Sequence, residues 1–238
     1  MTRDLEVDWL GTVPYADALE LQKETVDARR AGAGCDKLLL LEHPPVVTIG
    51  RGATAENLLI DPAELERRGV EFHRVSRGGD VTYHGPGQLV GYLIIDLAAR
   101  DERDVHRFLR KIEAATCSAL DELGIPSHIL DGYTGVFVGD SGDVPEAPAA
   151  LREARPRKIA SIGVGIRSWV TYHGFALNVD IDLTGFEAIV PCGLDFVEMT
   201  SVERELRVGG TANSGLAERA RNSVARACAE QWPAKASK

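Results

Sequence analysis

The chain has 238 residues, of which 44% are apolar, and it carries 27 Lys and Arg against 36 Asp and Glu. A single domain of this length would bury roughly 70–75% of its unfolded surface, enough for a core without disulfide or metal staples. The formal net charge of −9 argues against general nucleic-acid binding. A local basic patch is still plausible at Arg100, Arg103, Arg107, Arg110 and Lys111.

The first half of the chain predicts two amphipathic helices and several short strands. Pro14 opens a helix that places Tyr15, Ala18, Leu19, Gln22 and Val26 on one face and stops at Gly32. The second helix spans about 103–123, with Asp101 as candidate N-cap. A further short helix is predicted over 61–69, and strands are predicted over 37–41, 46–49, 70–75 and 89–97.

The second half is dominated by strands. They are predicted over 134–138, 159–166, 169–172 and 175–181, with a closing helix over 217–232. Segment 140–156 is rich in Pro, Gly, Ala and acidic residues, and it predicts a mobile surface loop. Hairpin-like groups of strands with few helices indicate an α+β fold, with a mixed, largely antiparallel sheet flanked by helices. No composition shift divides the chain, so we expect one domain over 1–238.

Four cysteines lie far apart and form no C-x-x-C pair: Cys35, Cys117, Cys192 and Cys228. This spacing is typical of a reduced cytoplasmic protein and not of a disulfide framework or a zinc site. The acidic N-terminal stretch lacks the apolar core of a signal peptide, and no apolar run reaches membrane-spanning length. We therefore expect a cytoplasmic protein with no metal, membrane or nucleic-acid partner.

One pentapeptide, Val-Thr-Tyr-His-Gly, occurs twice, at 81–85 and 170–174. Tyrosine and histidine carry hydrogen-bonding tips on flat apolar bodies, and glycine lets the backbone pass close to a ligand. Two copies of such a segment in one chain predict that both copies line the walls of one cleft. The first copy lies in the glycine-rich segment 77–88, which lacks both the P-loop lysine and the spacing of a dinucleotide fingerprint. We interpret that segment as a loop shaping a groove for an extended ligand.

Cys192 lies between Pro191 and Gly193, where a turn can expose its sulfur. With a pKa of about 8.5 only a few per cent of such a thiol is ionised at neutral pH, so a nucleophile needs a nearby cation. Lys158 is the candidate, because the apolar residues after it would partly desolvate its ammonium and let it exchange protons near neutral pH. On spacing alone, a small core cysteine and an ordinary strand-end lysine remain open.

Several motifs, in order, resemble the lipoyl(octanoyl) transferases of the lipoate/biotin protein ligase superfamily. They are Arg77-Gly78-Gly79, 81–89, Lys158-Ile159-Ala160-Ser161-Ile162-Gly163, 173–178 and Pro191-Cys192-Gly193. The resemblance runs from about Leu10 to Ala227. It implies the catalytic-domain fold of lipoate and biotin ligases, and the transfer of an octanoyl or lipoyl group from acyl carrier protein to a lysine of a lipoyl domain. This is the first step of protein lipoylation.

By position, the resemblance implies that Cys192 is the acyl-accepting nucleophile and Lys158 the general acid/base. The implied acceptors are the lipoyl domains of 2-oxoacid dehydrogenase complexes and the glycine cleavage H protein. A thioester donor needs no ATP, so no cofactor is expected. The implied substrate-binding residues are Arg77, Gly78, Gly79, Asp80, Val81, Thr82, Tyr83, His84, Gly85, Gln88, Ser161, Ile162, Gly163, His173, Gly174, Phe175 and Ala176.

An eight-carbon chain also needs an apolar slot. We expect it to be lined by Val81, Tyr83, Leu89, Ile162 and Phe175. Two features depart from the family pattern and bear on partner docking. Asp80 places a negative charge near the entrance, and segment 140–156 is longer than usual.

Three other functions compete with this interpretation. An ATP-dependent lipoate–protein ligase would share the fold, but Cys192 and the lack of a sizeable C-terminal accessory domain count against it. If the protein were a non-catalytic module that binds lipoyl domains, Cys192 and Lys158 would have no catalytic role. A cysteine protease is disfavoured because no Cys/His/Asn signature of that kind occurs.

Overall fold

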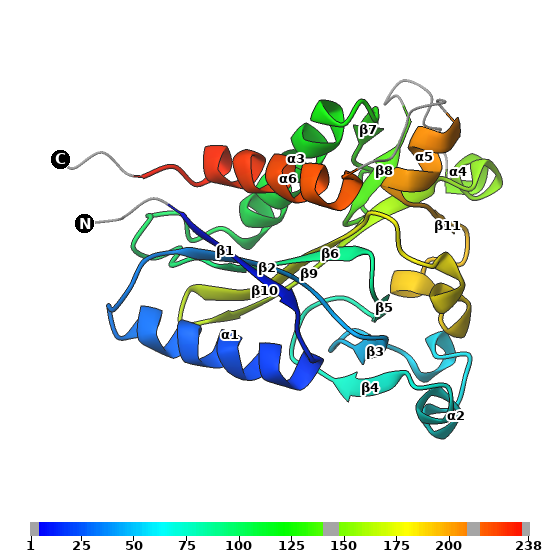
Figure 1. Ribbon diagram of the computed structural model, residues 1–238, viewed down its shortest axis with the longest axis horizontal. Helices are drawn as coiled ribbons and strands as arrows, with labels where there is room; N and C mark the ends of the chain where they lie inside the picture. Colours follow the sequence, from blue (N-terminus) through cyan, green and yellow to red (C-terminus); the bar gives the residue numbers. More distant parts are fainter. Residues whose placement is uncertain (1–4, 140–147, 209–214, 235–238) are drawn as a thin grey trace.

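A mixed eight-stranded sheet forms the centre of the protein, and helices cover both of its faces (Figure 1). The structure is a computed structural model that describes residues 5–139, 148–208 and 215–234. In chain order the strands of this sheet are β1 (Glu6–Thr12), β2 (Lys37–Glu42), β6 (Gln88–Ile94), β7 (Ser127–His128), β8 (Val136–Val138), β9 (Arg157–Arg167), β10 (Val170–Asn178) and β11 (Glu198–Met199).

The spatial order is β1-β2-β6-β10-β9-β8-β7, with β11 paired to β9. The pairs β1/β2 and β9/β11 are parallel, and the other neighbours are antiparallel. The predicted α+β fold with a mixed, largely antiparallel sheet is thereby confirmed. Strand β1 is missing from the sequence prediction. It is an edge strand whose Val7 and Trp9 remain exposed, so it lacks a clear pattern of buried residues.

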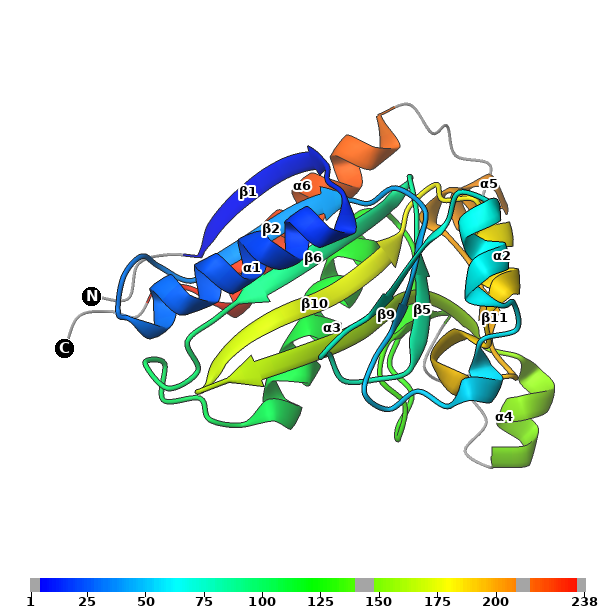
Figure 2. The same cartoon turned by 90° about the horizontal axis from the view of Figure 1, so that it is seen from below.

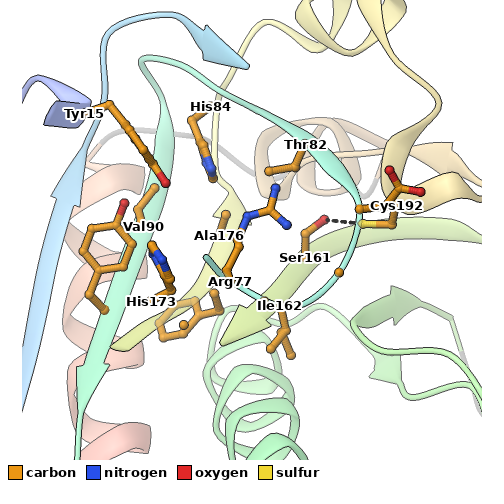
Figure 3. A pocket seen from close by; sticks show the side chains of 16 residues that line it. Tyr15, Arg77, Thr82, His84, Val90, Ser161, Ile162, His173, Ala176 and Cys192 are labelled. Atoms are coloured by element: carbon orange, nitrogen blue, oxygen red, sulfur yellow. Dashed lines mark hydrogen bonds between the residues drawn. The ribbon is translucent and has the colours of Figure 1, made fainter. Parts of the chain in front are cut away.

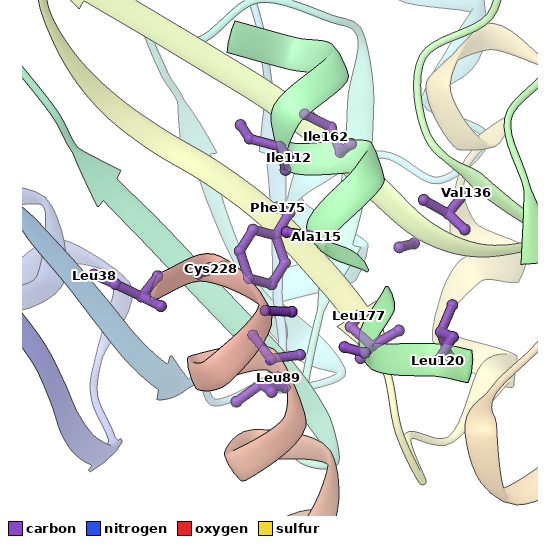
Figure 4. Packing of buried hydrophobic residues seen from close by; sticks show 14 of the residues in the cluster. Leu38, Leu89, Ile112, Ala115, Leu120, Val136, Ile162, Phe175, Leu177 and Cys228 are labelled. Carbon is purple, nitrogen blue, oxygen red and sulfur yellow. The ribbon is translucent and has the colours of Figure 1, made fainter. Parts of the chain in front are cut away.

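Three helices pack on the large sheet. Helix α1 (Tyr15–Arg30) covers one face, and α3 (Val105–Glu122) and α6 (Leu216–Gln231) cover the other (Figures 1 and 2). The α3 side holds the larger core, in which Ile112 and Leu120 of α3 pack with Phe175 and Leu177 of β10 (Figure 4). On the α1 side, Tyr15, Ala18, Gln22 and Val26 are buried as the helical pattern predicts.

A second, three-stranded sheet lies beside the large one. It has the order β4-β3-β5 and consists of β3 (Val46–Ile49), β4 (Glu71–Arg74) and β5 (Val81–His84). Short helices accompany it: η1 (Ala55–Asn57), α2 (Pro62–Arg67) and η3 (Leu183–Ala188). The prediction of a continuous loop over 77–88 is wrong, because Val81–His84 pairs with β3 as a fully buried strand. Alternating β-branched and aromatic residues favour a strand there despite the flanking glycines.

Two helical predictions need correction. The N-cap of α3 is Asp104, whose carboxylate accepts the backbone N–H of Arg107 at 3.0 Å, whereas Asp101 lies in the preceding turn with φ 57°. The second half of the supposed loop 140–156 contains helix α4 (Pro148–Ala154), while 140–147 lies outside the described residues. Helix α5 (Val202–Val208) follows β11.

The suggested basic patch is largely neutralised. Arg100 is buried against Asp36, with 2.5 Å between Nε and a carboxylate oxygen. Lys111 pairs with Glu102 at 2.9 Å, and Arg110 pairs with Glu113 at 2.7 Å. Across the described part of the chain, no helix has the length and apolar character needed to cross a bilayer.

The assignment of the α3 cap can be tested by denaturation. Asp104→Ala removes the side-chain acceptor of the first turn and should lower the free energy of unfolding by about 1 kcal/mol. Asp101→Asn is the control and should change it by less than about 0.5 kcal/mol, because Asn tolerates the left-handed conformation. Urea unfolding curves measure both, and a larger loss in the Asp101 variant would contradict the assignment.

Candidate active site

The sulfur of Cys192 lies 3.2 Å from the Nζ atom of Lys158. Lys158 belongs to β9 and is fully buried, while Cys192 is half-buried in the short helix η4 (Pro191–Gly193). The backbone of Cys192 is left-handed, with φ 55°. Such a conformation costs of the order of 1–3 kcal/mol for a non-glycine residue, so the surrounding turn must hold it. Val190 N–H donates to the Asn57 carbonyl at 2.8 Å, and Gly193 N–H donates to the Val190 carbonyl at 3.0 Å.

Lys158 is held between β8 and β11, where it pairs with Phe137 and Met199. Its Nζ lies 5.8 Å from the centroid of the Phe137 ring, which gives the cation an aromatic neighbour. Gly135 makes room for its side chain, since a Cβ there would lie 2.6 Å from Lys158 Cε. The Gly135 N–H donates to the buried carboxylate of Glu113 at 3.1 Å. The lysine is thus more deeply buried than its sequence context predicts.

Burial alone would raise the pKa of Cys192, but the charge of Lys158 lowers it. Hydrogen bonds with Lys158 and Ser161 and the more distant charge of Arg77 act in the same direction, so the pKa lies below its usual range. Two of the other thiols differ. Burial raises the pKa of Cys228 to about 12 and also raises the pKa of Cys117. Cys192 therefore combines a stabilised thiolate with partial exposure, as a nucleophile requires.

Cys192 lies at one end of a narrow cavity of about 40 Å³ (Figure 3). Its walls come from the segment before β5, from β5 itself, from β9 and β10, and from one residue of α1 and two of β6. The lining residues are Tyr15, Arg77, Gly79, Asp80, Thr82, His84, Val90, Tyr92, Ser161, Ile162, Gly163, His173, Gly174, Phe175, Ala176 and Cys192. Thr82 and His84 come from the first pentapeptide copy, and His173 and Gly174 come from the second. The prediction that the two copies form one cleft is confirmed.

Some predicted site residues do not line this cavity. Val81 and Tyr83 alternate with Thr82 and His84 along β5, so they point into the apolar cluster around Phe186. Leu89 packs in the core beneath α3. The expectation that these three residues line an acyl slot is therefore wrong. Gly78, Gly85 and Gln88 also lie outside the lining, although the side-chain carbonyl of Gln88 accepts a 2.7 Å hydrogen bond from His84 Nδ1.

The closed end of the cavity contains aromatic residues that the sequence did not indicate. Tyr15 comes from α1 and stacks near His84, with 6.1 Å between ring centroids, while Tyr92 of β6 bonds through its hydroxyl to His43 Nε2 at 2.7 Å. Burial lowers the pKa of His43 to about 4 and that of His84 well below its usual range. These imidazoles are therefore neutral at physiological pH. Tyr15 and Val90 resemble ordinary core residues in sequence, so only the fold reveals them.

Arg77 and Asp80 organise the segment between these two ends. The Arg77 guanidinium is buried and donates to the carbonyl and hydroxyl of Thr48 at 2.9 and 2.8 Å. Asp80 accepts the Val81 N–H at 2.6 Å and a side-chain N–H from Asn57. The charge of Asp80 thus helps to hold the loop beside the cysteine. Within the described ranges no cluster of three or more His, Cys, Asp or Glu side chains is arranged to hold a metal ion.

This fold is that of lipoate ligase catalytic domains. It superposes on the structure of lipoate-protein ligase A bound with ATP with a TM-score of 0.67, covering 96% of this chain and 85% of that one at 19% identity. A bipartite lipoate protein ligase from Thermoplasma acidophilum gives a TM-score of 0.64 over 96% of this chain and 84% of that one, also at 19% identity. At these identities the likeness concerns the fold alone.

The chain belongs to the family described as the lipoyl protein ligase A/B catalytic domain, whose model matches residues 14–217. It is 50% identical over 186 residues to an octanoyltransferase from Solibacter usitatus, covering 78% of this chain and 76% of the relative. It is 47% identical over 197 residues to an octanoyltransferase from Myxococcus xanthus, covering 83% of this chain. That match spans about half of the Myxococcus relative (52%). These relatives support an acyltransferase.

The influence of Lys158 on the thiol predicts a shift in reactivity. Lys158→Met keeps the buried stem but removes the charge, so the pKa of Cys192 should rise and its alkylation profile should move to higher pH. At neutral pH we expect alkylation by iodoacetamide to slow at least about tenfold, which corresponds to about 1.4 kcal/mol of lost thiolate stabilisation. Peptide mass spectrometry over a pH series measures Cys192 specifically. An unchanged profile would show that Lys158 does not set this pKa.

Two glycine-to-alanine substitutions, one of them a control, test whether Gly135 positions the Lys158 side chain. Gly135→Ala puts a methyl group 2.6 Å from Lys158 Cε and should move the ammonium away from the sulfur, so the pKa of Cys192 should rise. Gly139→Ala also has a positive φ, 120° against 133°, but its nearest neighbour would be 3.9 Å away. This control should share the backbone strain without altering the alkylation profile. Similar profiles in the two variants would contradict the proposed role of Gly135.

Proposed function

We propose that this protein transfers an octanoyl or lipoyl group from acyl carrier protein to a specific lysine of a lipoyl domain, through a thioester on Cys192. The observation that carries the proposal is the 3.2 Å contact between the Cys192 sulfur and the Lys158 ammonium beside a narrow cavity. Cys192 is the nucleophile and Lys158 the general acid and base. Octanoyltransferase relatives at 45–50% identity support the reaction class.

In the first half-reaction, the Cys192 thiolate attacks the thioester carbon of octanoyl-acyl carrier protein. A new carbon–sulfur bond forms and the bond to the carrier sulfur breaks, and the departing thiolate takes a proton from the Lys158 ammonium. One thioester replaces another, so the acyl group keeps its transfer potential. Energy from ATP is therefore not required at this step.

In the second half-reaction, the amine of the lipoyl-domain lysine attacks the acyl-enzyme thioester. The now neutral Lys158 accepts the proton that the amine loses, and Cys192 departs as a thiolate. An amide forms and the thioester is consumed, so the Cys192 thiolate and Lys158 ammonium pair is restored. The same contact thus serves both halves of the cycle.

The acyl chain enters the cavity next to Cys192, which must widen from its volume of about 40 Å³, since a cavity of about 150 Å³ is the size that admits a six-carbon ring. Ile162, Phe175, Ala176 and Val90 supply apolar surface along it, and the Ser161 hydroxyl lies 3.8 Å from the sulfur. Gly163 lets the segment before β5 pack closely on β9, because a Cβ there would lie 2.9 Å from the Gly78 carbonyl oxygen.

Each half-reaction involves a partner protein, an acyl donor in the first and an acyl acceptor in the second. An acyl donor and a lipoyl-domain acceptor are the general partners that the family supports. We assign the donor to acyl carrier protein, and the acceptors to the lipoyl domains of 2-oxoacid dehydrogenase complexes and the glycine cleavage H protein. We further propose that 1–238 acts as one catalytic domain in the cytoplasm, where its four free thiols would remain reduced.

Incubation with octanoyl-acyl carrier protein should add one octanoyl group, mapped by peptide mass spectrometry to Cys192. Cys192→Ala should give no adduct, while Cys117→Ala, a control thiol outside the site, should give the normal amount. Lys158→Ala should fold but turn over at least about 100-fold more slowly, as expected for loss of a general acid/base. An adduct that persists in Cys192→Ala would refute the mechanism.

The same assay distinguishes an octanoyltransferase from an ATP-dependent lipoate–protein ligase. Free octanoate with ATP and a lipoyl domain, but without acyl carrier protein, should give no octanoylated lysine. Efficient modification under those conditions would assign the chain to the lipoate–protein ligases. Binding of a lipoyl domain without any acylation would instead favour the non-catalytic module.

A further inference from the structure

The end of the cavity opposite Cys192 is closed by polar aromatic side chains. Tyr15, His84 and His173 lie on one side in Figure 3, and Cys192 and Ser161 lie on the other. The His173 ring lies between two tyrosines, with its centroid 6.0 Å from that of Tyr92 and 5.0 Å from that of Tyr172. The end of an alkyl chain would therefore meet a packed wall of rings.

The distance from the sulfur to this wall can be counted along β9. Ser161 lies beside Cys192, and three residues further along the strand Val164 pairs with His173 of β10. Three strand residues span about 10 Å at about 3.3 Å each. With C–C bonds of about 1.5 Å at tetrahedral angles, an extended eight-carbon chain spans about 9 Å. The length of an octanoyl group thus matches the distance to His173.

A second cavity, which reaches the protein surface at Lys23 and Arg167, also includes His173 in its lining. It has a volume of about 290 Å³, against about 40 Å³ for the first, and Leu19, Gln22 and Tyr172 contribute to its lining. His173 lines both cavities, and it is the residue that the two linings share. Removal of its ring would give an acyl chain access to the larger space.

The position of His173 is unusual for a strand residue. Its φ is 58°, and its backbone N–H donates to the buried Gln22 side chain of α1 at 2.8 Å. Burial, with a smaller contribution from the Arg77 charge, lowers the pKa of His173 to about 3, so the ring is neutral. A neutral ring fixed by its backbone can face an apolar chain without a charge to solvate.

We infer that the His173 imidazole is the end stop that limits the acyl chain to about eight carbons. This inference rests on the proposed acylation of Cys192. Shorter chains leave part of the cavity unfilled, and each methylene left unburied lowers affinity about fourfold. Longer chains must displace the ring and its neighbours. Gln22 is the positioning residue, since it holds the backbone that carries the ring.

Acyl carrier proteins loaded with eight-, ten-, twelve- and fourteen-carbon chains test the inference, with the rate of Cys192 acylation read by intact mass. Wild-type protein should prefer the eight-carbon donor over the twelve-carbon donor by at least about tenfold. His173→Gly, which suits the left-handed backbone, should bring the two rates within about threefold. His173→Asn, also compatible with that backbone, provides a second variant with a smaller opening.

Leu19→Ala is the matched control, because it enlarges the second cavity but leaves the imidazole in place. It should keep the wild-type chain-length profile. An unchanged profile in folded His173→Gly and His173→Asn, or equal wild-type rates for eight and twelve carbons, would overturn the end stop alone. Absence of any adduct on the wild-type protein would overturn the acyl-enzyme, and the end stop with it.

Discussion

The contact between the Lys158 ammonium and the Cys192 sulfur is the constraint on which the site depends. An isolated buried ammonium costs several kcal/mol, so its position is tolerable only beside a group that can carry negative charge. The thiol is that group, and the charge of Lys158 lowers its pKa and so favours the thiolate. The packing around the lysine serves this contact. Gly135 leaves space for its stem, and Phe137 faces its charge.

The antiparallel pair β9 and β10 connects the Lys158–Cys192 contact to the rest of the cavity. β9 carries Lys158 and Ser161 at the reactive end, and β10 carries His173 at the closed end. Because residues along a strand are evenly spaced, the number of residues from Ser161 along β9 gives an approximate distance from the sulfur. The two cores beneath α1 and α3 hold the strands in place from both faces, so the two ends of the cavity are fixed relative to each other.

Two strained backbone positions coincide with positions to which the proposals above assign a role. Cys192 and His173 both have a positive φ without being glycine, and both line the cavity. Each is held by hydrogen bonds from another element, through Asn57 next to the cysteine turn and through Gln22 of α1. A strained backbone conformation persists only where surrounding contacts hold it in place. Here it directs the Cys192 sulfur and the His173 imidazole toward the cavity, where a regular backbone would direct them elsewhere.

The sequence by itself determined the α+β class, the positions of most strands and the pairing of two pentapeptide copies in one cleft. It also offered Cys192 and Lys158 as candidates, from a cysteine between proline and glycine and a lysine before an apolar strand. Those local patterns left both roles open, and the resemblance to the lipoyl(octanoyl) transferases selected the two residues. Only the tertiary structure decided which side of β5 faces the cavity, and so placed Thr82 and His84 there in place of Val81 and Tyr83. It also showed that Tyr15 lines the cavity and that Gly135 leaves room for the Lys158 side chain. Their roles arise from contacts between elements distant in the chain, and period and composition carry no information about such contacts.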